Sequence, residues 1–206
     1  MNTIPLFPLN LVVFPNSSYP LHIFEERYKK MIKLCLKEEK GFGIVAPKNK
    51  ELSKIGSYVI ITQVLKKYKN GEMDIVVEAK KRFSIKNIST HPDGYLLADV
   101  EDYFDIQPEA NPNLIEEMEE IFERIMDKYN FEVEDSFWAR YETAKYKSFK
   151  IAEKSGLTLE QQQILLDLRD ENRRISYLIK HFEKLDEEIS QNIGLRKIIL
   201  GDGYLN

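Results

Sequence analysis

The stretch PLHIFEERY, residues 20–28, gathers the side chains of this sequence that are best suited to chemistry. His22 could exchange a proton near neutral pH, and Glu25 and Glu26 could serve as general acids, general bases or ligands. Arg27 could pair with one of these glutamates or with a neighbouring strand. Two interpretations follow: these residues form the acid/base corner of an active site, or they form a corner of the fold.

The residues that follow favour the second interpretation. Apolar side chains recur at helical spacing and predict a helix of roughly four turns; they are Phe24, Tyr28, Met31, Ile32, Cys35 and Leu36. We expect Phe24 to begin its buried face and Lys40-Gly41 to end it. Glu25 and Glu26 then lie in the first turn, where the helix dipole favours carboxylates. We therefore predict an architectural role for the corner. The alternative is that Glu25, Glu26 and Arg27 form an exposed charged edge that contacts another protein.

Other motifs that carry chemistry are missing from the sequence. It has no GxxxxGK[ST], no GxGxxG after a strand, no GxSxG and no HExxH. His22, His91 and His181 lie far apart and form no ligand pair at helical spacing. Cys35, the only cysteine, falls on the apolar face of the predicted helix, where we expect a small core side chain. We predict no catalytic residue, no cofactor site and no metal site.

Composition narrows the class of protein. The 206 residues carry a formal charge of −4, whereas nucleic-acid binders usually carry an excess of basic residues. The N-terminal MNTIPLFPLN lacks the positive region of a signal peptide, and no run of about eighteen apolar residues predicts a membrane span. A single cysteine fits a reducing compartment. We expect a cytoplasmic protein.

The first half of the chain, residues 1–107, has the pattern of a sheet. The predicted strands are TIPLF, LVVF, GFGIVA, SYVIITQVL, MDIVVEA, RFSIKNI and YLLADVEDYF. Asn70-Gly71 predicts a two-residue hairpin turn, because both residues tolerate positive φ. His91-Pro92-Asp93-Gly94 predicts a second turn. Short strands joined by tight turns indicate a small, partly closed antiparallel barrel.

The second half, residues 108–206, has helical periodicity. Asn111-Pro112 predicts the start of a first helix. A second helix is expected from about Phe137 to Ala152, closed by Gly156. Thr158 to Gln161 has the form of a capping box and opens a third helix. A fourth is expected over residues 169–193, and the tail GDGYLN is expected to lie outside this bundle of about four helices.

A series of segments then points to a family. IPLFPLNLVVFP, PLHIFEERYKKMIKLCL, GFGIV, IGSYVIITQV and NGEMDIVVEAKKRFSI occur in this order. The series resembles the N-terminal domain of Lon proteases, most of all its small stand-alone bacterial members. The resemblance implies an α+β fold: a PUA-like antiparallel β-barrel with one inserted helix, followed by a helical bundle. Two departures from the family pattern are Asn16 after Phe14-Pro15, where a glycine is usual, and Ala79 before the RRF-like element.

The resemblance also implies a function. In full-length Lon this domain precedes an AAA+ ATPase and a Ser–Lys protease domain and helps to recognise protein substrates. The sequence holds neither later domain, so we expect a non-catalytic module that binds protein or unfolded polypeptide segments, with a separate ATP-dependent protease as an open further partner. Binding could use strand addition at a barrel edge, or apolar anchors in a groove between the two halves.

Two alternatives remain from other functional classes. The first is an RNA-binding PUA-like domain, whose basic face would consist of Lys66, Lys67, Lys80, Lys81 and Arg82. The second is an enzyme with an unrecognised cleft. That reading requires a pocket that brings His22 or His91 against two carboxylates.

Overall fold

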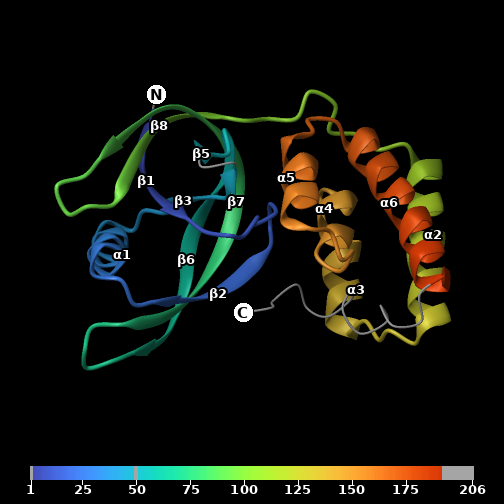
Figure 1. Cartoon of the computed structure of the whole chain (residues 1–206), viewed down its shortest axis with the longest axis horizontal. Helices are drawn as coiled ribbons and strands as arrows, with labels where there is room; N and C mark the ends of the chain where they lie inside the picture. Colours follow the sequence, from blue (N-terminus) through green and yellow to red (C-terminus); the bar gives the residue numbers. More distant parts are fainter. Residues whose placement is uncertain (1, 49–50, 192–206) are drawn as a thin grey trace. The chain divides into compact units, whose positions relative to one another are not determined.

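The computed structural model describes residues 2–48 and 51–191. The chain divides into two compact units, Met1–Phe104 and Asp105–Asn206, which we call the β unit and the helical unit (Figure 1). The predicted α+β class, with strands and one inserted helix before a set of helices, is confirmed. The predicted tail and the last residues of the predicted fourth helix lie outside the described residues.

The β unit is built on a six-stranded sheet in the order β2-β7-β6-β3-β1-β8. Its strands are β1 (Asn2–Pro8), β2 (Ser18–Ile23), β3 (Phe42–Val45), β6 (Ile55–Lys67), β7 (Met73–Thr90) and β8 (Leu96–Asp102). β7 pairs with β6 and β2 through its first half and with β8 through its second half, so the pairings from β7 through β6, β3, β1 and β8 return to β7. Such a cycle is what a partly closed barrel requires.

Two details of the sheet differ from the prediction. The pair β1–β3 is parallel, because β2 and a helix intervene between these strands and provide a long crossover connection. MDIVVEA and RFSIKNI belong to the single long strand β7. A separate short pair, β4 (Pro47–Lys48) with β5 (Glu51–Leu52), completes the unit.

The predicted strand LVVF is wrong. Val12, Val13 and Phe14 are buried, but they pair with no strand among the described residues. The carbonyl of Val13 accepts a hydrogen bond from the Ser57 hydroxyl instead, and a turn follows at once. In that turn Asn16 has a φ of 65°, so the asparagine supplies the positive φ expected of it in place of glycine.

Both hairpin turns occur where they were predicted, but the first has a different form. Tyr68 N donates to Glu72 O at 2.9 Å, and Gly71 N donates to Tyr68 O at 3.0 Å. In this turn only Gly71 has a positive φ, at 84°, so the loop has three residues and ends in a glycine bulge. The turn at residues 91–94 has the same form, with Gly94 at 88°.

Helix α1 (Glu26–Glu38) packs on this sheet through its apolar face. Its buried apolar residues are Tyr28, Met31, Ile32 and Cys35, as predicted. Two lysines hold the helix to the hairpin turns: Lys29 Nζ donates to Asn70 O at 3.0 Å, and Lys30 Nζ lies 2.7 Å from Asp93 Oδ1. These two contacts join α1 to both hairpin turns, in addition to its apolar packing on the sheet.

The end of α1 corrects the prediction that Lys40-Gly41 closes it. Glu39 is the left-handed residue, with a φ of 53°. Gly41 has another role, since a Cβ placed on it would lie 2.0 Å from the carbonyl oxygen of Val59. Its N–H also donates to Tyr58 Oη at 2.8 Å. Glycine is required here by the close approach of two backbone segments.

The helical unit contains five helices within the described residues, one more than predicted. They are α2 (Pro112–Tyr129), α3 (Asp135–Glu142), α4 (Lys147–Ala152), α5 (Leu159–Asp167) and α6 (Glu171–Gln191). Asn111 caps α2 and the Thr158–Gln161 capping box opens α5, both as predicted. α2 lies along α6 (Figure 1), and the rings of Phe122 and Phe182 meet with centroids 5.6 Å apart.

The predicted second helix is interrupted into α3 and α4. Lys147 Nζ donates to the carbonyls of Tyr141 and Glu142, at 2.6 and 2.9 Å. The Thr143 hydroxyl donates to the carbonyls of Ala139 and Arg140. Side chains thus donate to carbonyls that have no helical partner at the end of α3.

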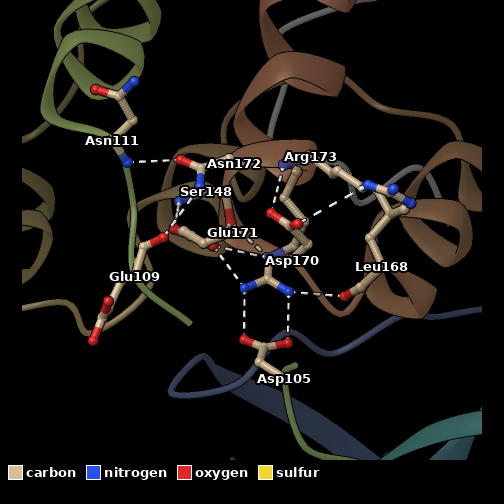
Figure 2. Close-up of polar contacts among 10 residues, drawn as sticks. Asp105, Glu109, Asn111, Ser148, Leu168, Asp170, Glu171, Asn172 and Arg173 are labelled. Carbon is tan, nitrogen blue, oxygen red and sulfur yellow. Dashed lines mark hydrogen bonds and ion pairs between the residues drawn. The ribbon is translucent and has the colours of Figure 1, made fainter. Parts of the chain in front are cut away.

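A buried polar network holds the start of α6. Figure 2 shows Asp105, Glu171, Ser148 and Leu168 around one guanidinium, which belongs to Arg174. The side chains of Arg174, Asp105 and Glu171 are at most 1% exposed. A buried cation of this kind is tolerated only when its donors are paired.

Candidate functional site

Strand β2 alternates between a buried and an exposed face. Tyr19, Leu21 and Ile23 pack against the core, whereas Pro20 and His22 face outward. Phe24 follows on the outward side and is 59% exposed, so the prediction that it begins the buried face of the helix is wrong. The strand alternation continues up to Ile23, and α1 starts only at Glu26.

His22 lies at the centre of a polar cluster on this outward face. Its Nδ1 is 2.6 Å from Asp74 Oδ1, and its Nε2 is 3.5 Å from Glu72 Oε2. Tyr68 Oη donates to Asp74 Oδ2 at 2.7 Å. The ring of His22 stacks on Phe24 at 6.0 Å between centroids. Hydrogen bonds from His22 and then from Tyr68 lower the pKa of Asp74.

This arrangement has only part of what catalysis requires. A histidine oriented by an aspartate can exchange a proton, and here it also faces a second carboxylate. However, His22 is half exposed. Two hollows, of about 370 and 500 Å³, are lined by other residues. Within the part of the chain that the structure describes, no group of three His, Cys, Asp or Glu residues could hold a metal ion. The contacts instead join β2 to the β6–β7 hairpin.

The three predicted contact residues lie beside this cluster. Arg27 Nε donates to Glu25 Oε2 at 3.0 Å, and its guanidinium lies 4.6 Å from the centre of the Tyr28 ring. Glu26 forms an ion pair with Lys29, and the hydrogen bond from Lys29 lowers the pKa of Glu26. The structure therefore brings Glu25 and Arg27 together and directs Glu26 to a different partner. All three side chains are well exposed.

We call the outward face of this region the corner surface. It consists of Pro20, His22, Phe24, Glu25, Glu26 and Arg27. An exposed aromatic ring surrounded by charged and polar side chains is suited to contact another macromolecule, because it offers an apolar anchor within a polar rim. Its use for binding remains a prediction.

The remaining nucleophilic and titratable candidates have structural contacts. Cys35 is buried, and burial raises the pKa of its thiol to about 11, as expected of a core residue. His91 Nδ1 accepts from Asp93 N at 3.1 Å within the β7–β8 turn. His181 is partly buried on α6, and its Nε2 donates to Ser155 O at 2.8 Å.

His181 gives a pH-dependent stability that can be measured. Burial lowers its pKa in the folded state, so below about pH 6.5 the unfolded chain binds a proton that the folded chain does not. We expect the helical unit to lose stability as the pH falls below that value, by at most about 1.4 kcal/mol per pH unit. Urea titrations followed by the fluorescence of Trp138, the only tryptophan, measure this loss. His181→Gln should flatten the dependence, and His22→Gln, in the other unit, should not. An unchanged slope in His181→Gln would contradict the assignment.

Three of the five basic residues of the RNA alternative are ion-paired or buried. Lys80 Nζ lies 2.5 Å from Glu78 Oε1, and Lys81 Nζ lies 2.5 Å from Asp102 Oδ1. Arg82 is 5% exposed and lies over the ring of Tyr103. Lys66 is over the Tyr68 ring. RNA binding therefore stays a prediction that none of these contacts favours.

Comparison with known proteins gives consistent results. The family model described as the ATP-dependent protease La (LON) substrate-binding domain matches residues 3–193. A Lon protease of Cytophaga hutchinsonii is 22% identical in an alignment 201 residues long, which covers 89% of this chain and 24% of that protein. The chain thus spans about a quarter of the length of this relative. None of the helices in the described ranges is long and apolar enough to cross a membrane.

Solved structures share the fold. A Lon N-terminal domain protein from Xanthomonas campestris aligns with a TM-score of 0.68 at 20% identity, covering 87% of this chain and 98% of that one. The N-terminal domain of the Lon protease from the Mycobacterium avium complex aligns with a TM-score of 0.66 at 17% identity, covering 88% of this chain and 98% of that one. These likenesses extend across both the β unit and the helical unit.

Proposed function

The chain belongs to the ATP-dependent protease La (LON) substrate-binding domain family, and on this premise we propose that it is a non-catalytic module that binds segments of other proteins. The match of the family model to residues 3–193 is the observation that carries the proposal. The ligand class is extended or unfolded polypeptide. The module acts in the cytoplasm, and a separate ATP-dependent protease is a further proposed partner.

We place the binding at the corner surface. Phe24 exposes more than half of its area, and aromatic side chains are enriched among the few residues that dominate protein interfaces. The stacked His22 ring limits the freedom of Phe24, which lowers the entropy lost on binding. Glu25, Glu26 and Arg27 add charges of both signs at the rim. These charges would select among polypeptide segments by electrostatic complementarity.

Side-chain anchoring fits this surface better than strand addition. Among the described residues β2 pairs only with β7, so its second edge could accept an added strand. Pro20 lies in the middle of β2 and has no N–H to donate, which weakens a backbone ladder there. We therefore expect affinity to depend on Phe24 more than on the β2 backbone.

The test is a titration of labelled, reduced and carboxymethylated α-lactalbumin, a permanently unfolded chain, followed by fluorescence anisotropy. The wild-type protein should bind it saturably. Phe24→Ser should weaken binding about tenfold, and Glu26→Lys with Arg27→Glu should weaken it by a smaller factor. Ile164→Ser is the matched control, because Ile164 is an exposed aliphatic residue of the helical unit.

Two outcomes would remove the proposal. Absence of saturable binding to any unfolded polypeptide is the first. Binding that is equal in Phe24→Ser and the control would place the site elsewhere. A labelled single-stranded RNA tests the alternative, since RNA binding would weaken steeply with added salt.

A further inference from the structure

The helical unit contains a groove that none of the contacts above involves. It has a volume of about 500 Å³ and lies between the C-terminal part of α2, the segment after it and α3. Its lining residues are Glu123, Met126, Asp127, Phe131, Glu132, Val133 and Trp138. Four of these are apolar and three are carboxylates, and none is basic.

The three carboxylates have no cationic partner among the described residues. Glu123, Asp127 and Glu132 are exposed, and their side chains form no hydrogen bond or ion pair with any described residue. Glu123 and Asp127 are four residues apart on α2, a spacing at which like charges repel. Lys128 follows directly, but its ammonium is 2.6 Å from Asp186 and 3.2 Å from Ser190.

The aromatic side chains give the groove a second preference for cations. Trp138 is half buried, and its ring packs edge-on against Phe137, Tyr141 and Phe122 with centroids 5.4 to 6.0 Å apart. The packing holds the indole in place, and the indole also lines the groove. Tryptophan is the best aromatic partner for a cation, and an arginine guanidinium stacks on it.

From this combination we propose that the groove binds an arginine side chain of a polypeptide segment. The guanidinium stacks on Trp138, the carboxylates of Glu123, Asp127 and Glu132 surround its charge, and its aliphatic stem contacts Met126 and Val133. Charge complementarity selects this occupant, because all three charged residues that line the groove are acidic. The Trp138 ring accepts a planar guanidinium better than an ammonium. The proposal is independent of the corner surface, which lies in the other unit.

Trp138 makes the test direct, because all tryptophan emission comes from the groove. The probe is a hexapeptide of glycine and serine with two central arginines; the matched probe has citrulline at both positions and keeps the shape without the charge. The arginine peptide should change the Trp138 emission saturably and bind at least about tenfold more tightly than the citrulline peptide. Added salt should weaken it.

Variants decide whether the groove is the site. Glu123→Gln with Asp127→Asn should weaken arginine-peptide binding about tenfold. Glu116→Gln with Glu120→Gln removes the same charge from exposed positions of α2 outside the groove and should leave binding unchanged. Equal binding of both peptides, no emission change, or equal losses in both double variants would overturn the proposal. Binding of unfolded lactalbumin through Phe24 would survive any of these results, so the two proposals fail separately.

Discussion

Replacing Arg174 by methionine is expected to destabilise the helical unit by about 3–5 kcal/mol. Removal of one partner from a buried ion network leaves the other charges buried without compensation. Here two carboxylates, Asp105 and Glu171, would remain where their side chains are 1% exposed. Methionine has a similar length, so the loss would come from charge and hydrogen bonding more than from a cavity.

The geometry of the network explains why the effect should be large. The guanidinium of Arg174 contacts both oxygens of Asp105, at 2.9 and 2.8 Å, in a bidentate pair. It also donates to Glu171 at 2.7 and 2.9 Å, to Ser148 Oγ at 3.0 Å and to Leu168 O at 2.8 Å. The other oxygen of Glu171 accepts from Ser148 N. One side chain thus links the segment before α2 to the starts of α4 and α6.

Urea unfolding followed by Trp138 emission measures this loss, because Trp138 belongs to the helical unit. Arg173→Met is the matched control: Arg173 is the preceding residue, its side chain is 78% exposed, and its loss should cost no more than about 0.5 kcal/mol. A cost near that of the control would mean that water reaches the network.

The sequence carries a local signal for only one member of this network, Arg174. Arg174 precedes Ile175 and lies one turn before Leu178, so it falls beside the apolar residues that form the buried face of α6. A burial signal therefore existed. The partner Asp105 is 69 residues away in sequence, and no local pattern pairs the two. Periodicity locates a helix face, whereas the tertiary contacts of that face depend on distant segments.

The corner surface shows the same limit. The buried side of α1, which includes Cys35, follows from spacing alone. Phe24 was misplaced because its spacing of four to Tyr28 also fits a helix, and only the start of α1 at Glu26 separates the two readings. The partners of His22 depend on the register of β2 with β7, which sets His22 opposite Asp74. That register joins residues 52 apart in sequence.

Gly41→Ala is the second substitution expected to have a large effect. The added Cβ would lie 2.0 Å from the carbonyl oxygen of Val59 and 2.8 Å from the Tyr58 ring. The nearest atom is backbone of strand β6, so it cannot move aside as a flexible side chain could. Either β6 or the start of β3 must shift, and the hydrogen bond from Gly41 N to Tyr58 Oη is lost with the shift. Overpacking of this kind costs about 3 kcal/mol or more.

Thermal unfolding followed by circular dichroism, together with amide exchange in the β unit, measures the effect. Gly94→Ala is the matched control. Gly94 has a φ of 88° in the β7–β8 turn, and a Cβ there would meet no atom within 4 Å. Gly94→Ala should therefore lower the free energy of unfolding only through the left-handed backbone, by about 1–2 kcal/mol. A smaller loss in Gly41→Ala than in Gly94→Ala would show that the connection from α1 to β3 can move away from β6, and that the predicted rigid approach is wrong.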